Sequence, residues 1–201
     1  MRRAVLAGAA LTAALALPAC GSADHSSSGH GAPATATGGA PASGSTAFGD
    51  ADVMFAQMMI PHHRQAVEMA ELAAARAADA EVKRLATRIT AAQGPEIATM
   101  TGWLTSWGRP VPSDGPGMPG MDHGMPGMMS DADLTRLAGA SGPEFDRQFL
   151  AMMIAHHEGA ITMANEELAK GTNAEARAMA QQIVTAQRGE IDEMNKILAR
   201  L

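Results

Sequence analysis

The sequence predicts an all-α protein: a ferritin-like four-helix bundle made of two duplicated helical hairpins joined by a long Met/Gly/Pro-rich connection. Three observations lead to this fold class. Apolar residues recur at three- and four-residue spacing over long segments, which is the pattern of an amphipathic helix. Hydrophobic residues make up 46% of the chain but aromatic residues only 3%, which is poor material for a β-sandwich or barrel. Finally, one segment of the chain occurs twice.

The duplication keeps one register over most of the chain. Met-Met-Ile-Pro-His-His at residues 58–63 returns as Met-Met-Ile-Ala-His-His at residues 152–157, so that matched positions lie 94 residues apart. Further matches at this offset are Phe55 with Phe149, Met69 with Met163, Ile89 with Ile183, Gln93 with Gln187, Glu96 with Glu190, and Met100 with Met194. Chance does not preserve such a register, so the domain consists of two copies of one unit.

The first 19 residues predict a bacterial lipoprotein signal peptide. Arg2 and Arg3 precede an apolar stretch at residues 4–17 that is too short to span a bilayer. Cys20, the only cysteine, follows in a context that resembles a lipobox, so we expect it to be lipidated and to anchor the protein outside the cytoplasm. An ordinary secretory signal is the alternative.

A linker and one folded domain are expected to follow. Residues 20–46 are rich in Gly, Ser, Ala, Thr and Pro, which predicts a flexible tether. Residues 47–201 then form the bundle, with repeat one at about 50–107, a loop at 108–142 and repeat two at about 143–201. The net charge of −6 argues against nucleic acid as a partner, and a single cysteine excludes an internal disulfide.

Each repeat is expected to fold as a hairpin of two long helices. In repeat one the apolar periodicity covers about residues 53–77 and 82–107. Asp79 is the expected N-cap of the second helix. Ser-Gly-Pro-Glu at residues 141–144 and Thr-Asn-Ala-Glu at residues 172–175 resemble capping boxes for the third and fourth helices.

Histidine pairs lie on the face that each hairpin is expected to bury. At about 100° per residue, His62 and His63 flank the apolar stripe that contains Met59, and Glu96 falls on the apolar face of the next helix. Burying such groups is costly unless they pair with one another or bind a metal ion. Because the second repeat has the same residues, we favour a metal site over a purely structural His–Glu–Gln network. The candidate metal ligands are Met59, His62, His63, Glu96, Met100, Met153, His156, His157, Glu190 and Met194.

The ligand types favour copper. Di-iron bundles carry Glu-x-x-His on their helices, whereas this chain has Met-x-x-His at residues 59–62 and 153–156. Thioether and imidazole together suit a soft ion such as Cu(I), although another transition metal would also fit.

The connection between the repeats offers six further ligands in a Gly/Pro-rich frame, where no core needs filling. We interpret it as an auxiliary metal loop, with a sticky interaction loop as the alternative. Only residues 131–138 are expected to add a short helix. The ligands of the auxiliary loop are Met118, Met121, His123, Met125, Met128 and Met129.

Residues 55–70 resemble the signature of the domain-of-unknown-function 305 (DUF305) family. They read Phe-Ala-Gln-Met-Met-Ile-Pro-His-His-Arg-Gln-Ala-Val-Glu-Met-Ala, and residues 149–164 match them. Gln-x-x-Glu-Ile-x-x-Met at residues 93–100 and 187–194 matches as well, so the likeness covers about residues 50–201. The resemblance implies a secreted, ferritin-like four-helix bundle and, for some members, copper binding and copper resistance outside the cytoplasm.

We therefore expect an extracytoplasmic, membrane-tethered protein that sequesters or transfers Cu(I) through Met and His ligands. Its expected partners are the metal ion, the membrane through the lipid anchor, and a copper-handling protein. Two alternatives stay open: a ferritin-like metal-dependent redox enzyme, and a non-metal interaction domain with a structural His–Glu network. The enzyme needs more carboxylates than the inner face offers, so binding is favoured over catalysis.

Overall fold

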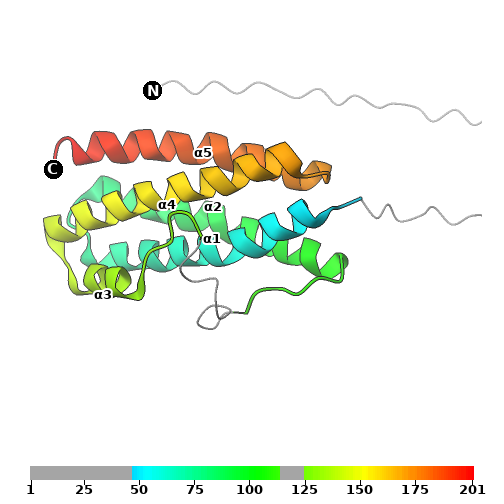
Figure 1. The fold of residues 1–201 in the computed structure, drawn as a ribbon. Helices are drawn as coiled ribbons and strands as arrows, with labels where there is room; N and C mark the ends of the chain where they lie inside the picture. Colours follow the sequence, from blue (N-terminus) through cyan, green and yellow to red (C-terminus); the bar gives the residue numbers. More distant parts are fainter. Residues whose placement is uncertain (1–46, 114–124) are drawn as a thin grey trace, which may run out of the picture. The chain divides into compact units, whose positions relative to one another are not determined.

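The computed structural model describes residues 47–113 and 125–201. All the secondary-structure elements of this part of the chain are α-helices (Figure 1). Long helices α1 and α2 form the first hairpin, and α4 and α5 form the second. The short helix α3 lies in the connection between them. The helix bounds are α1 Asp50–Arg76, α2 Ala80–Ser106, α3 Asp131–Gly139, α4 Gly142–Lys170 and α5 Ala174–Leu198.

The two hairpins pack together mainly through α1 and α4, while α2 and α5 lie against the outer sides of this central pair. The prediction of an all-α bundle of two hairpins is confirmed. Its ferritin-like topology stays a prediction, and the signal peptide, Cys20 and the linker lie outside the described residues. No helix of the described part is both long and apolar enough to cross a membrane.

The predicted helix starts are confirmed in part. Asp79 caps α2 and accepts hydrogen bonds from the backbone N–H groups of Glu81 and Val82 at 2.7 and 3.3 Å. At α5 the cap is Asn173 and not Thr172, because the Asn173 side chain accepts from residues 175 and 176.

The predicted capping box at α4 is wrong. Ser141 occupies the N-cap position but makes no side-chain capping hydrogen bond. Gly142 has a left-handed φ of 65°, which turns the first residue of the helix away from the usual capping geometry. Pro143 has no N–H to donate, so the first turn offers the serine hydroxyl one donor fewer.

A pair of buried aspartates ties each hairpin to the turn of the other. Asp52 on α1 accepts from the backbone N–H groups of residues 172 and 173 at 3.0 and 2.8 Å, in the turn between α4 and α5. Its repeat mate, Asp146 on α4, accepts from residues 78 and 79 at 3.1 and 2.9 Å, in the turn between α1 and α2. These bonds satisfy turn N–H groups and fix the register of α1 against α4.

Glu167 is a buried carboxyl group without a counterpart in repeat one, where Ala73 takes its place. Burial and the adjacent Asp52 carboxylate raise the pKa of Glu167 to about 8. For Asp52 burial acts in the opposite direction to its hydrogen bonds, and the hydrogen bonds lower its pKa to about 2. At neutral pH the proton therefore resides on Glu167, and Asp52 carries the charge that caps the turn.

Replacing Asp146 with alanine should lower the free energy of unfolding by about 1–3 kcal/mol, because the turn N–H groups lose their acceptor. Urea unfolding monitored by circular dichroism measures the change. Asp192→Ala, which removes an exposed carboxylate from α5, is the matched control and should have little effect. An equal effect of the two substitutions would show that the hydrogen bonds from the turn to Asp146 do not stabilise the fold.

Glu167 should make the protein less stable as the pH rises from about 4.5 to about 8. Its pKa is higher in the folded state than the ordinary value of 4.5, so its contribution is complete below about pH 4.5 and is lost as the pH rises through about 8. Glu167→Gln cannot ionise and should abolish this loss between about pH 4.5 and about 8, as measured by urea unfolding at each pH. The exposed neighbour Glu166→Gln is the control, and it should keep the wild-type pH profile.

Candidate metal centre

Two histidines meet where α1 and α4 cross. The ring centroids of His62 and His156 are 3.7 Å apart, with the ring planes tilted by 37°. Both side chains are buried, at 0% and 1% exposure. Because the two residues are repeat mates, this contact relates the two hairpins as an isologous contact relates two subunits of a dimer.

The other two histidines of the repeated motif each bond to a carboxylate. His63 Nε2 lies 2.7 Å from Glu96 Oε2, and His157 Nε2 lies 2.7 Å from Glu190 Oε2. The histidines are fully buried, whereas the two glutamates keep contact with solvent at 24% and 19% side-chain exposure. A carboxylate that accepts from Nε2–H fixes the ring orientation and leaves the lone pair on Nδ1, as in carboxylate–histidine–metal arrangements.

The nitrogen atoms of this cluster are incompletely paired. Nδ1 of His62, His63, His156 and His157 has no hydrogen-bond partner among the described residues, and Nε2 of His156 has none either. His62 Nε2 donates to the carbonyl oxygen of Pro126 at 3.1 Å. Buried polar atoms are nearly always paired, so several unpartnered imidazole nitrogens in one place require an explanation.

The central imidazoles are neutral. Burial, with the nearby His63, lowers the pKa of His62 to about 3. Burial also holds the pKa of His156 well below its ordinary value, and His62 adds to the shift. A neutral imidazole is the form that binds a transition metal, so these residues need no deprotonation before they coordinate.

The structure places the four predicted thioether ligands in the hydrophobic core, all fully buried. Met59 and Met100 belong to one core cluster, and Met153 and Met194 to the other. Within residues 47–113 and 125–201, no three or more His, Cys, Asp or Glu side chains are arranged to hold a metal ion. A metal site here would therefore need thioether sulfur as an additional ligand, or a rotation of the imidazole rings that brings their nitrogen atoms together.

A short segment at residues 125–129, which we call the strap, covers the histidines. The Gln65 side chain holds its end, donating to the Met129 carbonyl at 2.9 Å and accepting from the Met129 N–H at 2.8 Å. Gly127, with φ of 77°, packs against Gly159 of α4. A Cβ atom at Gly159 would lie 1.9 Å from the Pro126 oxygen, so only glycine allows this approach.

The sequence analysis missed Gln65 and Gly159 as site residues. The two residues occupy the same position of the two repeats, so the difference between glutamine and glycine within an otherwise matched motif was the available signal. The expectation that the auxiliary loop has no core to fill is wrong for Met129, which packs against the core because Gln65 holds its backbone. Met125 and Met128 are half-buried, and Met118, Met121 and His123 lie outside the described residues.

Comparison with known proteins identifies the family. The family described as "Domain of unknown function (DUF305)" matches residues 52–198. The chain belongs to the DUF305 family. No curated protein matches the chain significantly.

Solved DUF305 structures share this fold. A protein from Streptomyces coelicolor, described as a secreted DUF305 protein, is 37% identical with a TM-score of 0.68, and the match covers 75% of this chain and 93% of that one. A DUF305 fragment from Deinococcus radiodurans is 35% identical with a TM-score of 0.68, over 76% and 98% of the two chains. CopM in its Cu(II)-bound form is 37% identical with a TM-score of 0.65, over 74% and 96%. CopM has also been solved in Cu(I)-bound, Ag-bound and apo forms.

Gly159→Ala should displace the strap and destabilise this DUF305 protein by roughly 1–3 kcal/mol, because the new methyl group would overlap the Pro126 carbonyl. Gly189→Ala is the control, since a Cβ atom at this helical position of α5 meets nothing, and it should stabilise by about 0.5–1 kcal/mol. Urea unfolding measures both. If both substitutions raised the free energy of unfolding by the same amount, the strap would not depend on the absence of a side chain at Gly159.

Proposed function

We propose that this DUF305 protein binds Cu(I) in the core of its helical bundle and sequesters or transfers the ion outside the cytoplasm. The observation that carries the proposal is the set of four buried histidines on α1 and α4 whose Nδ1 atoms lack partners. Imidazole nitrogen and thioether sulfur are ligands that suit Cu(I). CopM, a family member of the same fold, has been solved with Cu(I), Cu(II) and Ag.

The contacts suggest different roles for the predicted ligands. His62 and His156 face each other and are neutral, which suits direct coordination by both. Glu96 and Glu190 already bond to His63 and His157, so we assign them the orientation of these rings rather than coordination. The buried thioethers are the remaining ligands of the site: Met59, Met100, Met153 and Met194.

The unpartnered nitrogens also favour this proposal over a purely structural histidine network. The hydrogen bonds from His63 and His157 to glutamates are what a structural network would form. Such a network, however, does not account for the unpartnered Nδ1 atoms of His62 and His156 or for the unpartnered Nε2 of His156, because each unpaired buried polar atom costs free energy of folding. A bound soft ion would accept these lone pairs and remove the cost.

The location outside the cytoplasm belongs to the proposal as well. The basic and apolar start of the chain, with Cys20 after it, supports export and a lipid anchor. The family member from Streptomyces coelicolor is described as secreted. In such a compartment the protein would hold copper at the membrane surface and pass it to a copper-handling partner.

Replacing both His62 and His156 with alanine should abolish high-affinity Cu(I) binding, because the central pair of nitrogen ligands is removed. Competition with a chromogenic Cu(I) chelator under reducing conditions measures the stoichiometry and affinity. His25→Ala with His30→Ala, which removes two imidazoles near the start of the chain, is the matched control and should bind as wild type. Wild-type binding by the core variant would refute the proposed site.

Deleting residues 114–124 removes three of the six predicted loop ligands, Met118, Met121 and His123. This deletion leaves the strap and its bonds to Gln65 and His62 in place. Binding that survives it excludes Met118, Met121 and His123 as required ligands, whereas binding lost with it would make the helices a scaffold for the loop.

A further inference from the structure

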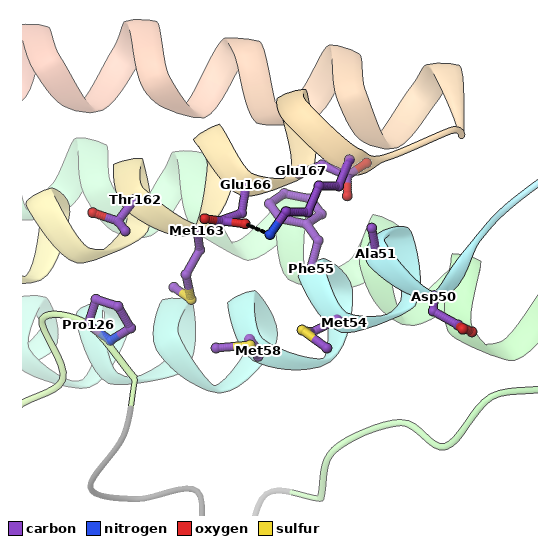
Figure 2. A pocket seen from close by; sticks show the side chains of 11 residues that line it. Asp50, Ala51, Met54, Phe55, Met58, Pro126, Thr162, Met163, Glu166 and Glu167 are labelled. Carbon is purple, nitrogen blue, oxygen red and sulfur yellow. Dashed lines mark hydrogen bonds and ion pairs between the residues drawn. The ribbon is translucent and has the colours of Figure 1, made fainter.

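A pocket of about 500 Å³ opens between α1 and α4, beside the strap (Figure 2). Three methionines line it, Met54 and Met58 from α1 and Met163 from α4. Figure 2 shows Met163 extending from α4 toward α1, where Met58 and Met54 lie on neighbouring turns. We call these three residues the thioether pocket.

The three thioethers span the depth of the pocket. Met54 is 60% exposed at its mouth, Met58 is half-buried, and Met163 is 6% exposed on the inner wall. Met54 and Met58 are four residues apart, so they share one face of α1. Phe55 and Pro126 add apolar surface to the lining, which also includes the charged residues Asp50, Glu166, Glu167 and Lys170.

The internal repeat shows that the bundle does not need this pocket for packing. The repeat mates of Thr162, Met163 and Glu166 are Glu68, Met69 and Leu72, which line a smaller pocket of about 190 Å³. There α3 lies over the groove, with side chains that include Leu134. The matching positions in the other half thus face α3 and line only the smaller pocket.

The open groove also has more thioethers than the repeat supplies. Met58 and Met163 have methionine mates, Met152 and Met69, but the mate of Met54 is Gln148. The third sulfur therefore belongs to the open side alone, at the most exposed position. A methionine at 60% exposure gains little from burial, so packing does not account for it.

Pro126 links the thioether pocket to the histidines. Pro126 lines the pocket, and its carbonyl oxygen accepts the hydrogen bond from His62 Nε2 at 3.1 Å. An ion in the pocket would thus be separated from the imidazole pair by the strap.

We propose that Met54, Met58 and Met163 form a second soft-metal site, which takes monovalent copper or silver at the mouth of the bundle. Three neutral thioethers bind a soft monovalent cation in preference to hard divalent ions. The flexible methionine side chains can adjust their positions to the ion. This site is separate from the proposed histidine site, and the two sites can be tested independently of each other.

The test titrates the full chain with Ag(I), using protein labelled with 13C at the methionine methyl groups. The methyl resonances of Met54, Met58 and Met163 should shift in a saturable manner. The variant Met54→Leu/Met58→Leu/Met163→Leu keeps the apolar volume but removes the sulfur, and it should bind one silver ion fewer than wild type. The matched control is Met69→Leu/Met152→Leu, the repeat mates of two pocket residues, which should bind as many ions as wild type.

Two further results separate this site from the core. In His62→Ala/His156→Ala the three methyl resonances should still shift, and their failure to shift would overturn a separate site. Unmoved resonances in the wild type, or an unchanged silver count in the triple variant, would overturn the proposal while leaving the histidine site intact. If an apolar probe such as benzene shifts the resonances and Ag(I) does not, the pocket is a site for apolar ligands. Should the triple variant fail to fold, Met54→Leu alone removes the most exposed sulfur and must weaken silver binding.

Discussion

The contact between His62 and His156 is the constraint on which the rest of the structure depends. It brings two imidazoles together at the crossing of α1 and α4, where a packed core would ordinarily place aliphatic side chains. Burial keeps both rings neutral, so they can approach without repulsion between charges. Apolar clusters on the two sides of the crossing supply the burial that offsets the cost of the unpaired nitrogens.

The outer helices and the turns hold this contact in register. Helices α2 and α5 carry the glutamates that orient the second histidine of each pair. Asp52 and Asp146 fix α1 and α4 by bonding to the turn of the opposite hairpin, so each hairpin is clamped at the end where it reverses. The position of the imidazoles is therefore set by hydrogen bonds at both ends of the central helix pair as well as by apolar packing.

Most of the fold and part of the site followed from the sequence, because their signals are local. Helical periodicity placed His62, His63 and Glu96 on buried faces, and the duplication doubled each observation. The clamp of Asp52 depends on a turn 120 residues away, a distance at which spacing carries no information. The strap was missed for the same reason, since the bond from Gln65 to Met129 joins a helix to a loop without periodicity. The prediction of a capping box at Ser141 was wrong because Gly142, with its left-handed φ, changes the local geometry.

The glycine at position 159 has a consequence for how such a protein can arise. Gln65 anchors the strap on α1, while Gly159 at the same place on α4 leaves room for it. In a symmetric homodimer of one hairpin, both positions would carry the same amino acid. Glutamine in both would collide with the strap, and glycine in both would leave it without an anchor. Joining the hairpins into one polypeptide frees them from obligatory identity, so that one half can specialise in holding the cover and the other in accommodating it.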